Sequence, residues 1–541
     1  MFNIPTVTVA KTTLTGTSSS VTLTYVAPSV AWTPRHLVVR VNGKTDRTGN
    51  SRDEVNVKFN GDTGTNYNYQ ALYGYASSSE AARYSGVAGL NVGWIATDNT
   101  ASTVFGSLEA MVPDALSTRT HKSVVAFVGA AEDGIVASAG RWASTVAITS
   151  VTMSPVTGTN FKAGSTFELC VVDESFNINE QIKGSAGTFT VSSIGGANGD
   201  LVVIGNLRSS RPTYSEDNAE FQFNGDTTVS NYNIQVLTGL SGTTVAAYSA
   251  NAPWYVFSRV PTSASPANVF GAGVALIPNF SDGSNDRVIT ALAGHHSNTG
   301  TSGSAVGITS TRWNNTAAIT SVLVEPSDSS NWLTGSMLST YAVPKNLIGR
   351  QELSGTVTSV TFADIPQTYD HLELSVYART DRSSTEDTVK VEFNGDTTAA
   401  NYDQQILLGA DSGVTAAQSA ASPSGIIVSA NSAGANIFGS GTVTIYNYTK
   451  TDRHKHWLGV SNKGANDVRI ASQRWENTAA ITSIVLDPAN GTNFLAGSVF
   501  ELRGIHADIA PAAGGASDVA ALNGIAPADI VFPAVGRYIC N

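Results

Sequence analysis

The residues best suited to bind a ligand form a short stretch, Phe-Asn-Gly-Asp-Thr, that occurs three times, at 59–63, 223–227 and 393–397. Carboxylate and amide oxygens of this kind bind calcium or sugars. Their spacing does not match a known calcium loop, whereas a turn that needs Asn-Gly, with Asp bonding its own backbone, explains the same residues. We therefore interpret the stretch as a turn and expect no metal site.

Recurring acids near the motif could form the carboxylate pair of a glycosidase. Asp46 and Asp381 occur in Thr-Asp-Arg, and Asp53 and Asp387 precede the motif. The second copy lacks the first of these acids, and ion pairing with a neighbouring arginine explains Asp381 more simply. No convincing Gly-x-Ser-x-Gly elbow, phosphate-binding loop or His-Glu-x-x-His helix is present. We expect no catalytic residues and no cofactor.

Two of the eight histidines could hold a metal. His454 and His456 are two residues apart, so on a strand they would share a face. Neither of the other copies has a similar pair, so we expect an exposed strand edge instead. His36 and His371 occupy matching places before a predicted strand where the second copy has Gly199-Asp200, and we interpret them as structural.

Aromatic side chains could stack on a sugar ring or a base. Arg-Trp recurs in each copy, but residues of a strand alternate faces, so we predict that each tryptophan packs in the core under the motif phenylalanine. The tyrosine of the Asn-Tyr pair after each motif is the candidate glycan contact. These candidate glycan contacts are Tyr67, Tyr232 and Tyr402. The structural residues of the repeat are Phe59, Asn60, Gly61, Asp62, Phe223, Asn224, Gly225, Asp226, Phe393, Asn394, Gly395, Asp396, Trp142, Trp313 and Trp475.

A β-strand must position each motif, because apolar and polar residues alternate on its N-terminal side. Val55, Val57 and Phe59 share one face, with Asn56 and Lys58 on the other. Asn-Gly tolerates the positive φ of a type I′ turn, and a second alternating run follows it. We predict a β-hairpin at each copy that fixes the register of its strands.

A threefold repeat organises the whole chain. Phe59 and Phe223 are 164 residues apart, and Phe223 and Phe393 are 170 apart, which is too long for a solenoid repeat. Each unit holds roughly eight to ten short strands and no helical period. We predict an all-β fold of three tandem antiparallel β-sandwich, jelly-roll-like domains in series, plus a C-terminal extended arm. The predicted boundaries are 1–173, 174–344 and 345–506, with the arm at 507–541.

The amino-acid composition limits the classes of molecule that the protein is expected to bind. Charged residues are 13% of the chain, against about 25% in typical soluble domains. A net charge of -11 argues against nucleic acid and anionic membranes as partners. We expect neither a signal peptide nor a membrane span. Cys170 and Cys540 have no counterparts in the other copies; we interpret them as a buried thiol and a tail thiol, with a disulfide as the alternative.

Several motifs shared by the units carry a family resemblance. They are Thr-Asp-Arg, Phe-Asn-Gly-Asp-Thr followed by Asn-Tyr, Phe-Gly, Arg-Trp followed by Thr-Ala-Ala-Ile-Thr-Ser, and Gly-Thr-Asn-Phe followed by Phe-Glu-Leu. Together they resemble a module of the virion structural proteins of tailed bacteriophages. The resemblance covers all three units and brings no catalytic residues.

This resemblance implies a non-enzymatic virion structural protein, expected as a head fibre or a capsid decoration protein. Such a protein is assembled in the host cytoplasm and resides in the virion. Its expected partners are other capsid or tail proteins and further copies of itself, with a trimer as one form of homo-oligomer. A tail-fibre-type adhesin that binds host surface glycans is the alternative, and a polysaccharide depolymerase comes third.

Overall fold

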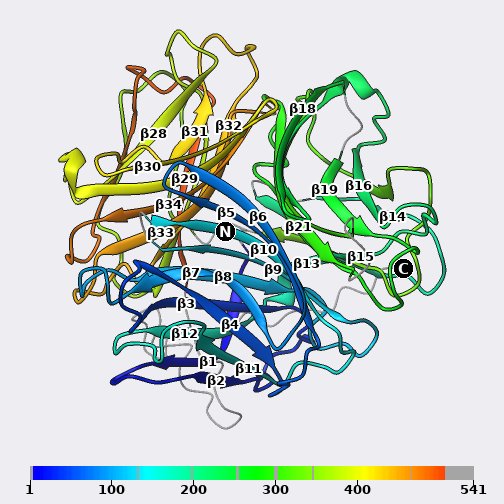
Figure 1. Ribbon diagram of the computed structural model, residues 1–541. Coiled ribbons are helices and arrows are strands. Elements are labelled where there is room, and N and C mark those ends of the chain that lie inside the picture. The colour runs from blue at the N-terminus through cyan, green and yellow to red at the C-terminus, as the bar shows by residue number, and fades with distance from the viewer. Residues whose placement is uncertain are drawn as a thin grey trace, which may run out of the picture.

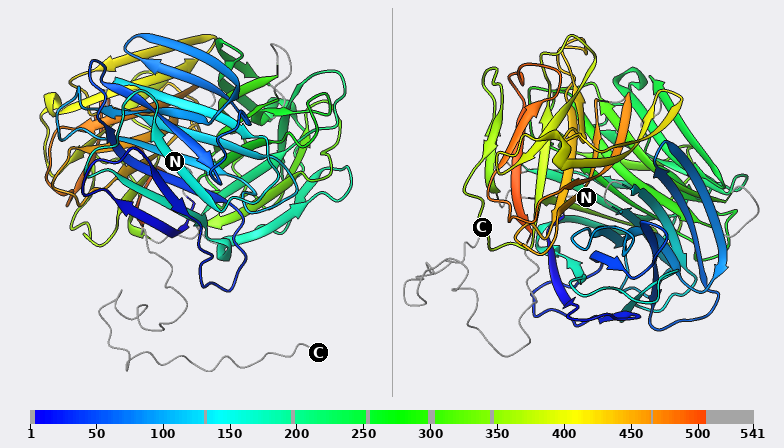
Figure 2. Two further views of the ribbon diagram at one scale, coloured as in Figure 1. Left: turned by 60° about the horizontal axis from the view of Figure 1, so that its bottom comes forward. Right: turned by 60° about the vertical axis from the view of Figure 1, so that its left-hand side comes forward.

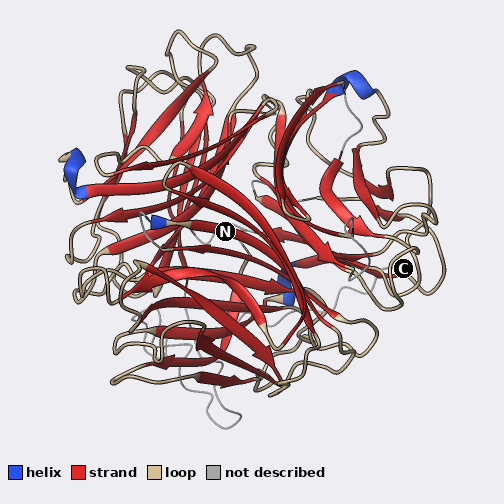
Figure 3. Ribbon diagram, in the orientation of Figure 1, coloured by secondary structure: helices blue, strands red, loops and turns tan. Residues whose placement is uncertain are grey.

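The computed structural model of the chain describes residues 4–130, 133–195, 199–251, 255–297, 303–343, 347–464 and 466–505. Its regular structure is almost entirely strand, with a few short helical turns (Figure 3). The predicted all-β fold is confirmed. In these ranges no helix is long and apolar enough to cross a membrane. The predicted arm and Cys540 lie outside the described residues.

The first domain contains an eight-stranded layer, β1-β12-β3-β8-β9-β10-β5-β6, and a four-stranded layer, β2-β11-β4-β7. A short parallel pairing of β3 with β7 joins the two layers at one edge. Its strands are β1 (Thr6–Thr13), β2 (Val21–Thr24), β3 (Leu37–Thr45), β4 (Arg52–Phe59), β5 (Tyr67–Tyr75), β6 (Ser78–Val87), β7 (Leu90–Thr97), β8 (Gly106–Val112), β9 (Lys122–Gly129), β10 (Ile135–Trp142), β11 (Ser150–Pro155) and β12 (Thr166–Val172).

The second domain repeats this topology, with layers β13-β24-β15-β20-β21-β22-β17-β18 and β14-β23-β16-β19. Its elements are η2 (Glu174–Phe176), β13 (Asn177–Ile182), β14 (Phe189–Val191), β15 (Asp200–Leu207), β16 (Glu216–Phe223), η3 (Val229–Asn231), β17 (Tyr232–Leu240), β18 (Thr243–Ala250), β19 (Tyr255–Pro261), β20 (Gly271–Ile277), β21 (Arg287–His296), β22 (Ser304–Trp313), β23 (Val322–Pro326) and β24 (Met337–Val343).

The third domain has the same strand order again, with layers β25-β36-β27-β32-β33-β34-β29-β30 and β26-β35-β28-β31. Its elements are β25 (Leu347–Glu352), β26 (Val360–Phe362), β27 (His371–Ala378), β28 (Glu386–Phe393), η4 (Ala399–Asn401), β29 (Tyr402–Ala410), β30 (Gly413–Ser419), β31 (Ile426–Ser429), β32 (Gly439–Tyr446), β33 (Lys455–Asn462), β34 (Asp467–Trp475), β35 (Ile484–Pro488) and β36 (Val499–Ile505).

The core of each domain lies between its two layers. In β4, Val55, Val57 and Phe59 are buried while Asn56 and Lys58 are half-buried on the opposite face, as the alternation of residues predicts. The larger sheet of each domain is apolar on both faces, because its second face packs on the other domains. One hydrophobic cluster therefore contains side chains of all three domains.

The domains surround a common centre and do not follow one another as beads in series. Figure 1 shows the first domain at the bottom, the second at the right and the third at the left, with their larger sheets turned inward. The views in Figure 2 show the same grouping from two other sides. The three larger sheets meet through the strand pairs β5–β6, β17–β18 and β29–β30. The result is an approximate threefold arrangement within a single chain.

The prediction of a β-hairpin at the repeat motif is wrong, because the strands before and after the motif do not pair with each other. β4 pairs with β11 on one side and with β7 on the other, so it has no free edge for β5. β5 instead pairs with β10 and β6 in the larger sheet. The motif is therefore an arch that carries the chain from one layer of the sandwich to the other, and it does not set the register between two neighbouring strands.

Candidate functional site

The turn of each arch has the predicted geometry. Asn60 and Gly61 have φ values of 52° and 67°, and the Asp62 backbone N–H donates to the Phe59 carbonyl over 2.9 Å. The corresponding φ values are 53° and 69° in the second copy and 54° and 71° in the third. Positive φ at both central residues defines the type I′ turn, which explains why Asn-Gly occurs each time.

The aspartate of the motif is a structural acceptor. Asp62 Oδ2 accepts from Trp142 Nε1 over 2.7 Å and from Asn66 Nδ2 over 2.9 Å, while its Oδ1 accepts from the Gly64 N–H. The hydrogen bond from Trp142 holds the pKa of Asp62 below its ordinary value. Asp226 and Asp396 accept from their own tryptophans over 2.8 Å. These bonds occupy the oxygens that a calcium ion would need.

The asparagine side chain ties the arch to the segment before β11. Asn60 Nδ2 donates to the Ala147 carbonyl over 2.8 Å, and its Oδ1 accepts from the Thr149 and Ser150 N–H groups over 2.7 and 3.1 Å. Asparagine therefore serves the turn twice, through its tolerance of positive φ and through its amide.

The three tyrosines proposed as glycan contacts are buried, which corrects that expectation. The Tyr67 side chain is 0% exposed, and its hydroxyl accepts from the Phe59 N–H over 3.0 Å. Tyr232 and Tyr402 are equally buried and make the same bond to their own motifs. A ring enclosed between two layers cannot stack on a sugar, so these tyrosines lock the arch from inside the sandwich.

The tryptophans pack in the core against the motif phenylalanines, as predicted. The ring centroids of Phe59 and Trp142 are 5.7 Å apart, and those of Phe223 and Trp313 are 5.6 Å apart. Phe393 and Trp475 are separated by 5.5 Å. Each tryptophan thus fills the core with its ring and anchors the motif aspartate with its N–H.

The recurring acids hold the turn that closes the sandwich in the first and third domains. Asp46 Oδ1 accepts from the Thr159 and Asn160 N–H groups over 2.7 and 2.9 Å, and Asp53 Oδ2 accepts from the Gly158 N–H over 2.8 Å. Asp381 and Asp387 make the same contacts in the third domain, so Asp381 caps a turn where ion pairing was expected. These carboxylates do not form an acid and base pair around a cleft.

The expectation of an exposed edge at the histidine pair is wrong. His456 lies on β33, a central strand whose outer face packs on the first domain, and its side chain is 1% exposed. Its Nδ1 and Nε2 lie 2.7 and 2.9 Å from the Ser107 and Ser472 hydroxyls. Burial lowers the pKa of His456 to about 3. Among the described residues, no cluster of three or more His, Cys, Asp or Glu could hold a metal.

A pattern that sequence reasoning missed, Gln-x-Leu-x-Gly, closes the ring of domains. It spans 70–74, 235–239 and 405–409, at the same distance after each motif tyrosine. Each leucine packs on the glycine of the next domain, and a Cβ atom added at that glycine would lie 3.0 to 3.2 Å from the leucine Cβ. The contacts join Leu72 to Gly239, Leu237 to Gly409, and Leu407 to Gly74. Glycine permits this close approach of the sheets.

Two of the three glutamines of the same pattern, Gln235 and Gln405, reach across the junctions. Gln235 Nε2 donates to the Asp411 carbonyl over 3.1 Å, and Gln405 Nε2 donates to the Ala76 carbonyl over 3.2 Å. Both acceptors lie in hairpin turns with positive φ, at 49° and 46°. Each glutamine therefore supports a turn that belongs to another domain. Identical spacing in all three copies was the signal that could have identified this interface.

A second contact recurs at the position of the histidines before the core strand. His371 Nδ1 accepts from the Asn447 N–H over 3.0 Å, so Nε2 carries the proton and donates to Glu168 Oε2 over 3.1 Å. His36 likewise accepts from the Asp114 N–H and lies 3.3 Å from the Ser339 hydroxyl of the second domain.

Asp200 takes this position in the second domain and makes equivalent contacts. Its Oδ1 accepts from the Asn279 N–H over 3.0 Å, and its Oδ2 accepts from Arg503 of the third domain over 3.1 Å. The residue at this position in each domain thus contacts the last strand of another domain. His36 contacts the second domain, Asp200 the third and His371 the first. The three contacts close a cycle.

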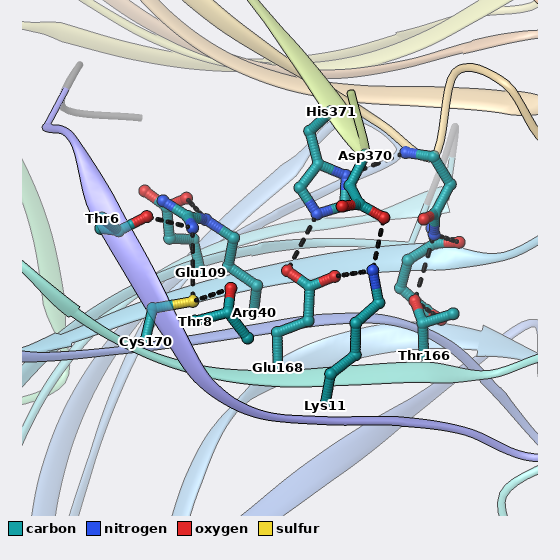
Figure 4. Close-up of polar contacts among 12 residues, drawn as sticks. Thr6, Thr8, Lys11, Arg40, Glu109, Thr166, Glu168, Cys170, Asp370 and His371 are labelled. Atoms are coloured by element: carbon teal, nitrogen blue, oxygen red, sulfur yellow. Dashed lines mark hydrogen bonds and ion pairs between the residues drawn. The ribbon is translucent and has the colours of Figure 1, made fainter. Parts of the chain in front are cut away.

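The junction of the first and third domains is ionic (Figure 4). Lys11 lies between Glu168, at 3.2 Å, and Asp370, while His371 contacts the other oxygen of Glu168. Burial acts to raise the pKa of Glu168, but His371 and Lys11 outweigh it and hold that pKa at about 2. Beside this group, Cys170 is buried with its sulfur 3.3 Å from the Thr8 hydroxyl.

Comparisons with known proteins do not place the chain in a family. No family model and no curated protein matches it. Among solved structures, sucrose-6-phosphate hydrolase from Lactobacillus gasseri is 8% identical, with 75% of this chain and 89% of that chain covered and a TM-score of 0.17. OccK7 (OpdD) from Pseudomonas aeruginosa is 9% identical, with 84% and 100% covered and a TM-score of 0.09. Similarity at this level carries no argument about fold or function.

Proposed function

We propose that this chain is a non-enzymatic structural protein of a tailed-bacteriophage virion, a head fibre or a capsid decoration protein. The observation that supports the proposal best is the closed ring of three domains within one chain. Icosahedral heads present sites of threefold symmetry, and a block with matching pseudosymmetry can meet three copies of one partner with three similar surfaces.

The chemistry of the repeat supports a structural role. The oxygens of the motif aspartates are used by tryptophan and backbone donors, and the recurring acids cap turns. His456 lies between two hydroxyls at a domain junction. Polar groups that catalysis or metal binding could have used therefore stabilise the fold and the ring. The motif resemblance points to the same class of protein.

The ring bears on the expected homo-oligomer, which stays a prediction. One chain already supplies three subunit-like domains, and their shared core is a hydrophobic cluster of the kind that obligate trimers bury. We propose that such three-domain blocks associate further on the virion, with one another as the expected homo-oligomer and with capsid or tail proteins.

Mass spectrometry of purified particles, with cryo-electron microscopy of the same particles, tests the proposal. We expect the chain among the virion proteins, with density for a three-lobed block at a threefold or quasi-threefold site of the head. Light scattering of the purified chain tests the homo-oligomer: a multiple of the 56.2 kDa chain mass supports it, and the mass of a single chain counts against self-association in solution. Absence of the chain from washed particles would overturn the proposal, and density on the tail would replace the head location with a tail-fibre location.

A further inference from the structure

A cavity of about 360 Å³ opens on the outer face of the smaller sheet of the first domain. Asn56 and Lys58 of β4, Asn91 of β7 and Ser154 of β11 line it, and the segment 87–89 between β6 and β7 closes one side. We call it the β4–β7 cleft. Its polar lining consists of amide, hydroxyl and ammonium groups, while Val87, Pro155 and Val156 add apolar surface. Its ligand must therefore combine polar groups with apolar faces.

The amides of the cleft are held in place. Asn56 Nδ2 donates to Asn91 Oδ1 over 2.7 Å, and Asn91 Nδ2 donates to Glu54 Oε2 over 3.2 Å. Gly89 lies against this chain, and a Cβ atom added there would be 2.3 Å from Asn56 Oδ1. A side chain at 89 would therefore displace the Asn56 amide, and with glycine there the polar groups of the cleft are oriented before any ligand arrives.

Charge selects among polar ligands. Lys58 is the only charged residue that lines the cleft, and its ammonium has no ion-pair or hydrogen-bond partner among the described residues. A carboxylate on a ligand would provide that partner in a place partly shielded from solvent. No aspartate or glutamate lines the cleft itself, and the carboxylate of Glu54, next to it, accepts a hydrogen bond from Asn91.

An exposed aromatic ring lies on β6, the strand whose last residue, Val87, lines the cleft. Tyr84 is 42% exposed and stacks on Tyr69, with ring centroids 4.7 Å apart and an interplanar angle of 23°. One face of the Tyr84 ring is thus held rigidly, and the ring can stack on the apolar face of a sugar.

The other two domains show that the fold does not need these residues. Strand pairing places Ser249 and Ser419 where the first domain has Tyr84. The same reasoning places Gln222 and Glu392 where it has Lys58. Because both domains build the same two layers without a lysine or a tyrosine at these positions, the combination is specific to the first domain.

We propose that the β4–β7 cleft binds an acidic glycan of the uronic-acid class. Lys58 pairs with the carboxylate, the amides of Asn56 and Asn91 bond ring hydroxyls, and Tyr84 stacks on a neighbouring sugar. This site is independent of the location of the protein on the particle. It differs from the tyrosines first considered as glycan contacts, which are buried.

Isothermal titration of the full chain with tetragalacturonate, and with neutral maltotetraose as the comparison, tests the proposal. We expect binding of the acidic probe only, weakened by added salt. Lys58→Gln should lower the affinity about tenfold or more, because it removes a charge-assisted hydrogen bond. Tyr84→Ser, which installs the residue of the other two domains, should also weaken binding. Gly89→Val should abolish it by filling the cleft.

Matched controls keep the result specific. Lys390→Gln removes a lysine from the same sheet face of the third domain, and Tyr214→Ser removes an exposed tyrosine of the second domain. Both should bind as the unchanged chain does. Thermal melting of each variant checks that it is folded. If Gly89→Val does not fold, the affinity of Lys58→Gln for tetragalacturonate alone tests the proposal. No binding of tetragalacturonate, equal binding of maltotetraose, or unchanged affinity in Lys58→Gln would each overturn the proposal.

Discussion

Single side chains in this protein serve two neighbours at once. The motif aspartate accepts from a tryptophan of the core and from its own loop, and the motif asparagine bonds both a carbonyl and two N–H groups. Such residues look like ligand-binding groups in a sequence, because the same oxygens suit an ion or a sugar. The structure shows that these residues support the turn, because the tryptophan N–H lies within hydrogen-bond distance of the aspartate and the segment before β11 lies within that distance of the asparagine.

The buried imidazole of His456 predicts a loss of stability in acid. Burial lowers the pKa of His456 to about 3 from its ordinary value of 6.5. The unfolded chain takes up a proton below pH 6.5 and the folded chain does not, so stability is lost as the pH falls from 6.5 toward 3. This residue alone contributes a slope of up to about 1.4 kcal/mol per pH unit.

Urea denaturation between pH 7 and pH 4.5 measures this slope. His456→Gln should have a shallower pH dependence than the unchanged chain, because glutamine does not titrate. Ser472→Ala serves as the control, since it removes a hydrogen bond to the ring and keeps the titrating group. The interpretation fails if His456→Gln and the unchanged chain lose stability in parallel.

At the scale of elements, the sequence predicts strands and turns better than it predicts their partners. The alternation in β4 and the positive φ at Asn-Gly follow from local chemistry, and both are present. The same turn chemistry suits a hairpin and an arch, however. The arch forms because β7 and β11 occupy both edges of β4 and because the motif tyrosine bonds the end of β4 from the other layer. The strands that flank β4 come from distant parts of the sequence, so the local pattern does not reveal them.

The arch predicts different effects for two substitutions of one residue. Asn224 has a φ of 53°, and its amide bonds Ala318, Thr320 and Ser321. Asn224→Gly and Asn224→Ala both lose these bonds. Asn224→Ala also places a Cβ in the left-handed region, which costs roughly 1 to 2 kcal/mol more.

Chemical denaturation should therefore rank the stabilities as unchanged chain, then Asn224→Gly, then Asn224→Ala. The exposed neighbour Thr227→Ala should match the unchanged chain. Equal stabilities of the glycine and alanine variants would show that the left-handed conformation does not contribute.

The whole molecule depends on close approach between sheets at the centre of the ring. Leu72 packs on Gly239, and the two other leucine and glycine contacts complete the circle. The sequence contained the relevant pattern, Gln-x-Leu-x-Gly, three times over. This pattern was not recognised as an interface because a strand that is buried on both faces has the same apolar sequence in either of two situations. Its second face can pack within its own domain or against another domain.

A large side chain at this centre should open the ring while each sandwich stays folded. In Gly239→Leu, the new Cβ would lie 3.2 Å from the Cβ of Leu72 and 3.3 Å from that of Ala81, and neither neighbour can move without its strand. We expect a larger radius of gyration in small-angle X-ray scattering, with little change in the far-ultraviolet circular dichroism.

Gly184→Leu is the matched control, because no atom lies within 4 Å of a Cβ added at that position. It should scatter as the unchanged chain does. An unchanged radius for Gly239→Leu, with unchanged melting, would mean that the ring does not depend on this contact.

Covalent linkage of the three domains also changes what a single mutation can do. In an assembly of identical chains, one codon sets the same residue at three places, so a useful change at one place is repeated at the others. Here His36, Asp200 and His371 occupy corresponding positions and make three different junctions. A mutation can therefore change one domain while the other two keep their sequences and their contacts in the ring. A new surface or ligand site can arise in one domain without appearing in all three.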